Sequence, residues 1–234
     1  MLWPFAWSPL YWLIVGPALL LMLYAQWRVQ SAYSRWTRVS NSHQIQGAKA
    51  AELLLSQNGL SGIGMKGIGG QLTDNYDPRS KVLNLSQGTA LGSTVASLAI
   101  VAHEIGHAEQ DASGYLPLKL RSGLVPAVNF GSRLGPIVFI LGLLMQWDPL
   151  MWLGIIFFAS AFVFALITLP VELDASNRAI KMLRTSNLLV GEKELQGARA
   201  VLNAAALTYV AGMVTALAQL LYYVMLASGG RRRD

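Results

Sequence analysis

The segment VAHEIGH, residues 101–107, contains an HExxH pattern and decides most of what the sequence predicts about fold and function. Two histidines four residues apart lie one turn apart on the same face of a helix, so the imidazoles of His103 and His107 can reach one metal ion. The glutamate between them, Glu104, would stand beside a metal-bound water. The chain has only three histidines, so this segment uses two of them.

Apolar neighbours favour a metal site over two exposed histidines. Residues 97–102 are mostly apolar, as are Ile105 and Ala108, so the pattern is expected within a buried helix over residues 91–111 that ends near Gly114. Unpaired imidazoles and a carboxylate in such a helix would be costly, and metal coordination removes that cost. The alternative is a chance match on a surface helix.

The composition indicates a membrane protein. Of the 234 residues, 53% are hydrophobic and 13% are charged, whereas a soluble domain carries about 25% charged residues. The chain has no cysteine, which excludes disulfides, thiolate zinc ligands and a cysteine nucleophile. Its net charge of +6 is not arranged as a basic stripe interleaved with aromatics, so we expect a lipid bilayer and no nucleic acid as partner.

Four apolar runs are candidates to cross a bilayer, which takes about 20 apolar residues. They cover residues 9–27, 124–147, 149–169 and 203–226. The first run lacks a basic region before it and a small-residue cleavage site, so we interpret it as an uncleaved anchor. Pro170 is expected to end the third run, and a new helix over residues 173–184 is expected to follow.

These runs predict a mainly α-helical membrane protein of five segments. They are an anchor (1–27), a catalytic region with the HExxH helix (28–121), a transmembrane hairpin (122–169), a helix carrying the third ligand (170–202), and an apolar helix with a basic tail (203–234). Lysines and arginines are concentrated between the first and second runs and between the third and fourth. Because short basic loops stay cytoplasmic, the HExxH region should face the cytoplasm or its boundary with the membrane. The basic residues 231–233 oppose this orientation if the fourth run crosses fully.

The polar region before the HExxH helix carries weaker signals. Residues 46–57 predict a short amphipathic helix that ends at Gly59. Residues 62–67 match the dinucleotide-binding pattern GxGxxG by letter, but no strand clearly precedes them and no helix follows, so we expect glycine-rich turns and a thin strand. Residues 71–73 and 81–86, on either side of a turn at 74–78, predict a small β-hairpin or meander.

The third metal ligand must come from elsewhere, because catalytic zinc takes three protein ligands and leaves a position for water. The extended pattern HExxHxxGxxH is excluded, since Gln110 and Ser113 stand where it needs glycine and histidine. The remaining histidine, His43, lies in a polar segment and is interpreted as a solvated loop residue. A carboxylate is therefore favoured, and Glu172 is the best candidate. The alternative for Glu172 is a helix-dipole partner in a first turn.

Other residues are candidates to support the site. Ser176, one turn after Glu172, shares its helix face and can orient a ligand by a hydrogen bond, whereas Asp174 points to another face. The candidate donors to a developing oxyanion are Tyr76, Tyr209 and Arg199, in no preferred order.

Four blocks resemble the signature blocks of the bacterial YugP-like membrane zinc metallopeptidases. They are LTDNYDPRSKVLNLS (72–86), AHEIGHAEQ (102–110), PVELDAS (170–176) and VLNAAALTYVA (201–211), and the resemblance covers about residues 47–211. This family is more distantly similar to the HtpX and CAAX-protease type of gluzincin, in which two membrane helices also separate HExxH from the glutamate ligand. The resemblance implies a zincin-like region in a bacterial plasma-membrane protein, with one Zn2+ bound by His103, His107 and Glu172, and Glu104 catalytic.

Two positions depart from the patterns that this resemblance implies. Asn75 stands where the YugP-like family usually has histidine, so any role of that histidine is lost or altered. Ser176 stands where the HtpX type has aspartate.

Together the residues predict a membrane zinc endopeptidase acting on a peptide or membrane-protein substrate. Glu104 would accept a proton from zinc-activated water and pass it to the leaving amine. A strand over residues 81–86 is expected to offer an edge for pairing with an extended peptide. The candidate substrate-binding residues are Lys81, Val82, Leu83, Asn84 and Leu85.

Two other function classes are weighed against the enzyme. A non-catalytic zinc-stabilised membrane scaffold or adaptor would have a closed site, with Asp174 or His43 as a further ligand. A zinc transporter is disfavoured, because the third and fourth apolar runs contain no His, Asp or Glu. Small residues of the last run, such as Ala211 and Gly212, allow close helix packing and leave open a homo-oligomer or a regulatory membrane partner.

Overall fold

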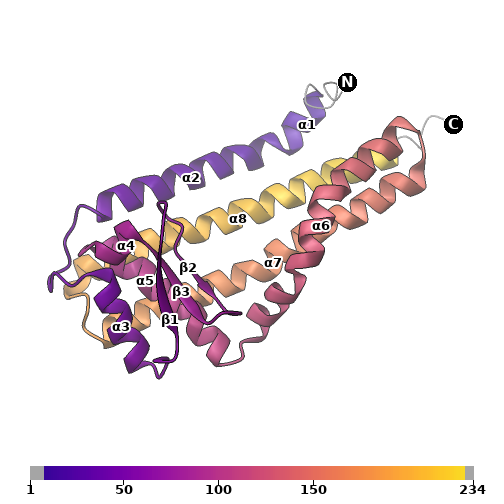
Figure 1. Cartoon of the computed structure of the whole chain (residues 1–234). Helices are drawn as coiled ribbons and strands as arrows, with labels where there is room; N and C mark the ends of the chain where they lie inside the picture. Colours follow the sequence, from indigo (N-terminus) through magenta and orange to yellow (C-terminus); the bar gives the residue numbers. More distant parts are fainter. Residues whose placement is uncertain (1–7, 230–234) are drawn as a thin grey trace. The chain divides into compact units, whose positions relative to one another are not determined.

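The structure, a computed structural model, describes residues 8–229 as a mainly α-helical chain with one small sheet (Figure 1). This confirms the predicted mainly helical class. The elements, in chain order, are α1 (Pro9–Ile14), α2 (Gly16–Trp36), α3 (Gly47–Gln57), β1 (Gly64–Ile68), β2 (Asn75–Asp77), β3 (Val82–Ser86), α4 (Gln87–Leu91), α5 (Val95–Ala112), α6 (Leu116–Leu144), α7 (Asp148–Thr185) and α8 (Gly191–Gly229).

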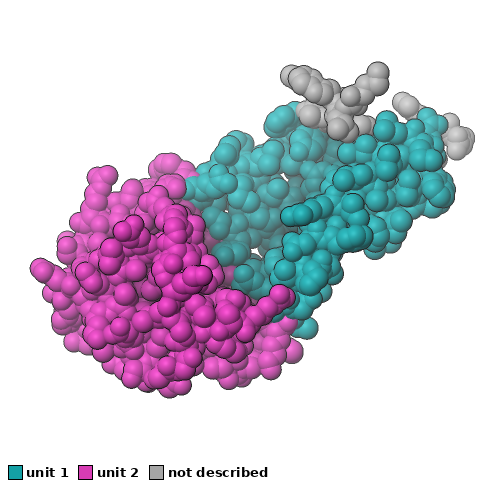
Figure 2. All heavy atoms as spheres, in the orientation of Figure 1, with its two compact units in different colours: residues 1–26, 120–169, 208–234 teal, residues 27–119, 170–207 magenta. Residues whose placement is uncertain are grey.

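The chain divides into two compact units, coloured separately in Figure 2. Unit 1 comprises residues 1–26, 120–169 and 208–234, and unit 2 comprises residues 27–119 and 170–207. Unit 2 therefore holds the whole sheet, α3, α4, α5 and the residues of α7 from Pro170 onwards. The predicted division into five consecutive segments stays a prediction.

Within residues 8–229, three helices are long and apolar enough to cross a membrane: α6, α7 and α8. They correspond to the second, third and fourth predicted runs. The first run is divided between α1 and α2 at Val15 and is not among these helices, so the count of four spans stays a prediction. The basic residues 231–233 lie outside the described part of the chain.

Pro170 lies inside α7 and does not end it, so the predicted helix start after Pro170 is wrong. Glu172 consequently lies within a long helix and not in a first turn. A proline removes one backbone N–H and crowds the preceding turn. Long apolar helices tolerate this loss when neighbouring groups satisfy the freed carbonyl. In the same way, residues 191–229 form one helix, α8, across the predicted boundary at residue 203.

The sheet has the order β1-β3-β2, with β1 parallel and β2 antiparallel to β3. The prediction that Lys81 to Leu85 form an edge strand is therefore wrong, because β3 is the central strand and is paired on both sides. β1 is the thin strand expected in the glycine-rich stretch. Its sequence, GMKGI, does not alternate between apolar and polar residues, so the sequence does not indicate that it pairs with β3. The hairpin also differs in register, because β2 occupies the predicted turn and the chain reverses at residues 78–81.

The core of unit 2 surrounds α5. Leu98, Val101 and Ile105 are fully buried and pack in one cluster with residues of α3, including Leu54. Burial of each such side chain stabilises the fold by roughly 1.5–3 kcal/mol. α5 is thus held rigidly along the length that carries the HExxH residues.

The start of α5 differs from the prediction. The helix begins at Val95 and not at residue 91, because the side chain of Thr94 accepts a hydrogen bond from the backbone N–H of Ser97 and caps the helix. A separate short helix, α4, precedes it. The end agrees with the prediction, since Gly114 follows the last turn with a φ of 69°.

Candidate metal centre

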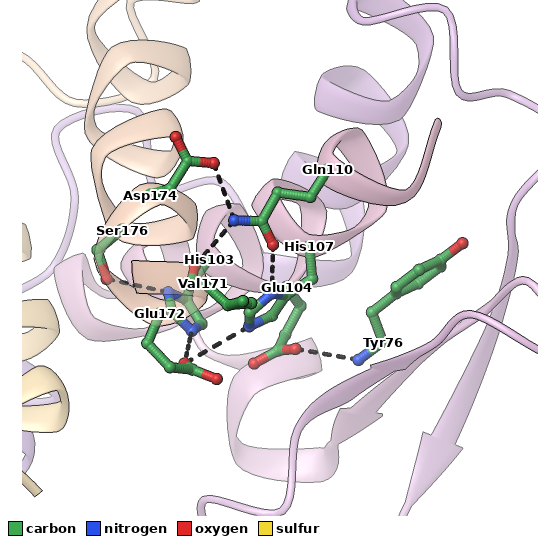
Figure 3. A network of polar contacts seen from close by, with 9 residues as sticks. All are labelled: Tyr76, His103, Glu104, His107, Gln110, Val171, Glu172, Asp174 and Ser176. Carbon is green, nitrogen blue, oxygen red and sulfur yellow. Dashed lines mark hydrogen bonds and ion pairs between the residues drawn. The ribbon is translucent and has the colours of Figure 1, made fainter. Parts of the chain in front are cut away.

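Two helices of unit 2 supply the candidate ligands. α5 carries His103, Glu104 and His107, and α7 carries Glu172 (Figure 3). The Nε2 atom of His103 lies 3.2 Å from Oε2 of Glu172, and Nε2 of His107 lies 3.6 Å from the same oxygen. One ligand atom from each of these three residues lies within 4.8 Å of the others. In the described residues, they form the one group of this kind.

The donor set fits a zinc ion. Glu172, His107 and Glu104 are 1%, 8% and 9% exposed, so two carboxyl groups and an imidazole are withdrawn from water. Buried charges of this kind are paired or coordinate a metal. Two imidazole nitrogens and one carboxylate oxygen are a usual protein ligand set of catalytic zinc, which keeps one further position open.

Electrostatic interactions at the site follow from this burial. Burial raises the pKa of the Glu104 carboxyl, although the neighbouring His103 and His107 act in the opposite direction. The pKa of the His107 imidazole is raised overall. Burial alone would lower it, but the hydrogen bond with Glu172 and the negative charges of Glu104 and Glu172 together outweigh burial.

Both histidines have partners on their Nδ1 atoms. Nδ1 of His107 lies 3.0 Å from Oε1 of Gln110, and Nδ1 of His103 lies 3.3 Å from Oγ of Ser176. Ser176 thus lies where the sequence placed it, beside a candidate ligand. The sequence alone identifies Gln110 only as a residue that excludes HExxHxxGxxH. Its position one turn after His107 was the signal that could have identified it.

Asp174 does not join the cluster. Its Oδ2 accepts hydrogen bonds from Nε2 of Gln110 at 2.9 Å and from Nε of Arg178 at 2.6 Å. His43 is also elsewhere: its Nε2 lies 3.0 Å from the carbonyl oxygen of Asn187. The two residues considered as an additional ligand therefore contact other groups.

Tyr76 contacts the cluster through its backbone. Its N–H donates to Oε2 of Glu104 at 3.0 Å, whereas its hydroxyl donates to Oδ2 of Asp111 at 2.7 Å (Figure 3 shows the ring turned away). The Lys81 ammonium pairs with the same Asp111 oxygen. Burial, together with the hydrogen bond to Asp111, raises the pKa of the Tyr76 phenol. The hydroxyl is therefore not directed at the ligands.

The two other candidate oxyanion donors lie on α8. Nη1 of Arg199 is 3.8 Å from Oε2 of Glu192, and both side chains are exposed. Tyr209 belongs to unit 1. Tyr76 contacts a cluster residue, Glu104, and that contact is made by its backbone.

Comparisons with known proteins agree with this chemistry. The model of a family described as "putative neutral zinc metallopeptidase" matches residues 11–228. A protein of Bacillus subtilis (strain 168) named "putative membrane protease YugP" is 40% identical over 214 residues, which are 92% of this chain and 95% of that protein. No solved structure gives a significant match.

Proposed function

Because the chain belongs to this family of zinc metallopeptidases, we propose that it is a membrane-embedded endopeptidase whose zinc is bound by His103, His107 and Glu172. The observation that carries the proposal is the convergence of their ligand atoms within 4.8 Å, although His103 and Glu172 are 69 positions apart. The Nε2 atoms of both histidines face Oε2 of Glu172 and would hold the ion.

Zinc, when bound, lowers the pKa of a coordinated water to about 7 and polarises a carbonyl. Glu104 is the residue that moves protons: its carboxylate accepts the water proton and later delivers it to the leaving amine. Its raised pKa suits a group that must hold a proton between these two transfers. The Tyr76 backbone N–H, bonded to Oε2, orients the Glu104 carboxylate.

The substrate is proposed to pair with β2 and not with β3. β2 is an edge strand, and its Tyr76 N–H reaches Glu104, so the edge lies beside the proposed general base. An extended peptide can add to such an edge through main-chain hydrogen bonds, which would use main-chain groups of β2 other than the Tyr76 N–H that Glu104 holds. The proposed substrates are peptides or membrane proteins that present an extended segment.

Two observations support a membrane location, and a third supports an orientation. α6, α7 and α8 are long and apolar enough to cross a bilayer, and α7 also carries Glu172. The Bacillus subtilis relative is named a membrane protease. The distribution of lysine and arginine supports an active site facing the cytoplasm of a bacterium or its membrane boundary.

A non-catalytic zinc scaffold is the competing proposal. It would need a fourth protein ligand to close the site. The two residues considered for that role, Asp174 and His43, contact Gln110 and Asn187 respectively. These contacts favour the enzyme.

The test compares Glu104→Gln with the unchanged protein, both purified full-length in detergent. Glu104→Gln should retain one zinc ion per chain and lose cleavage by at least about 100-fold, the usual effect of removing a general base. Glu52→Gln, an exposed glutamate of α3 paired with Lys49, is the matched control and should change neither property. Retained cleavage in Glu104→Gln would overturn the assignment. Cleaved termini from cells with each protein would identify the substrates.

A further inference from the structure

Gln110 is a fully buried polar residue, with 0% of its surface exposed. It lies on α5, and its side chain makes contacts in two directions. Nε2 donates to the carbonyl oxygen of Val171 at 2.8 Å and to Oδ2 of Asp174 at 2.9 Å, both on α7. Oε1 faces Nδ1 of His107 at 3.0 Å. The amide thus connects a candidate ligand on one helix with the helix that carries another.

The partners determine which way the amide points. A carbonyl oxygen and a carboxylate oxygen can only accept hydrogen bonds, so the group facing Val171 and Asp174 must be the NH2. The group facing His107 is then the amide oxygen, which can only accept. Nδ1 of His107 must therefore carry a proton, and in the neutral ring Nε2 keeps the lone pair. Nε2 is the atom that faces Glu172.

Asp174 is itself held in place. Nε of Arg178 donates to Oδ2 of Asp174 at 2.6 Å, and Nη1 of Arg178 lies 3.3 Å from Oε1 of Glu109 on α5. Arg178 therefore connects α5 and α7 a second time. This fixes the carboxylate that receives the Gln110 amide.

We propose that Gln110 is a positioning residue that selects the Nδ1–H tautomer of His107 and ties this histidine to the helix of Glu172. The inference rests on the zinc site proposed above. It assigns Asp174 an indirect role, as the acceptor that orients Gln110, and not the role of a ligand. Loss of such an outer partner of a metal-binding histidine typically weakens metal affinity by about 10- to 100-fold.

The first experiment measures zinc affinity by competition with a chelator, using the full chain in detergent. Gln110→Met keeps the approximate size but removes the amide, and should weaken zinc binding by about 10- to 100-fold. Its Co2+-loaded form should show a changed visible spectrum, because the His107 ring is no longer held. Leu98→Val, also fully buried in α5, is the control for a general loss of stability and should change neither reading.

A rescue separates positioning from packing. In the double variant Gln110→Glu/Asp174→Asn, the carboxylate at 110 can still accept a hydrogen bond from Nδ1–H of His107 and can accept another from the amide NH2 at 174. Zinc affinity and the Co2+ spectrum should return towards those of the unchanged protein. Gln110→Glu alone would place two carboxylates together and should bind zinc more weakly than the double variant.

A third experiment uses the unchanged protein, so its result does not depend on whether a variant folds. In the zinc-loaded form, nitrogen-15 NMR of the histidine side chains should show His107 bound through Nε2 with a proton on Nδ1. Binding through Nδ1 would overturn the inference, as would unchanged zinc affinity in Gln110→Met. Failure of the unchanged protein to bind zinc, or cleavage by Glu104→Gln, would instead reject the proposed function.

Discussion

Gly106 lies directly against the backbone of Ala175: a Cβ at position 106 would come within 2.6 Å of the Ala175 carbonyl oxygen. Gly106 stands between the two histidines of α5, and Ala175 stands three residues after Glu172 on α7. The absence of a side chain at Gly106 therefore allows α5 and α7 to pack closely beside the candidate metal ligands. The second variable position of HExxH, Gly106, is in this chain a packing position.

Gly106→Ala should destabilise the fold, although alanine normally favours a helix over glycine by about 1 kcal/mol. The new methyl group meets backbone, which cannot move aside like a flexible side chain, so overpacking of about 1–3 kcal/mol is expected. Unfolding in denaturant, followed in detergent, measures the change. Gly123→Ala is the control, because this glycine lies in α6 with open space around its Cβ position. Equal stability changes in the two variants would contradict the prediction.

Glu172→Gln should lose zinc while retaining the fold, because the amide keeps the size of the side chain but not its charge. The loss of affinity should exceed the roughly 10- to 100-fold expected for an outer partner. Metal analysis of the purified chain and chelator competition provide the measurement. Glu192→Gln, an exposed glutamate of α8, should bind zinc normally. Full zinc occupancy in Glu172→Gln would show that another residue is the third ligand.

Removal of zinc by a chelator should lower the unfolding midpoint, since a ligand that binds only the folded state stabilises it. At a free zinc concentration of 1,000 times Kd, the stabilisation would be about 4.1 kcal/mol. His107→Ala should unfold at the same midpoint with and without chelator. A chelator effect of equal size in that variant would place the stabilising metal elsewhere.

Tyr76→Phe tests a candidate oxyanion donor whose backbone N–H contacts Glu104. Its hydroxyl donates to Asp111, so its removal should cost about 0.5–1.5 kcal/mol of stability and leave cleavage nearly unchanged. Loss of a true oxyanion donor would reduce kcat by about 100- to 1,000-fold. Tyr115→Phe, on a tyrosine whose ring lies beside Arg178, serves as the comparison. A large drop in kcat for Tyr76→Phe alone would show that the hydroxyl turns towards the substrate.

Local spacing predicted the part of the site that lies within one helix. His103 and His107 share a face of α5 because they are four residues apart, and no tertiary information is needed for that. Glu172 followed by elimination, since cysteine is absent and His43 is isolated. The structure brings Glu172 to the two histidines, which was the main long-range expectation.

The errors have a common physical origin, because each depended on contacts that a local pattern does not contain. Pro170 is a local signal for a helix end, but α7 continues through it. β3 has the pattern of a half-buried strand, and nothing in that pattern shows that the glycine-rich β1 pairs on its other side. The role of Gln110 depends on Val171 and Asp174, which are distant in the sequence.

Because α7 continues through Pro170, the direction in which the Glu172 side chain points depends on the number of residues in the apolar part of the same helix. One residue deleted between Asp148 and Glu172 would turn the carboxylate by about 100° relative to the preceding residues, because an α-helix has about 3.6 residues per turn. A deletion of about seven residues, close to two full turns, would nearly restore its direction, with an error of about 20°. Length variation in this stretch among related chains should therefore come in steps of whole helical turns.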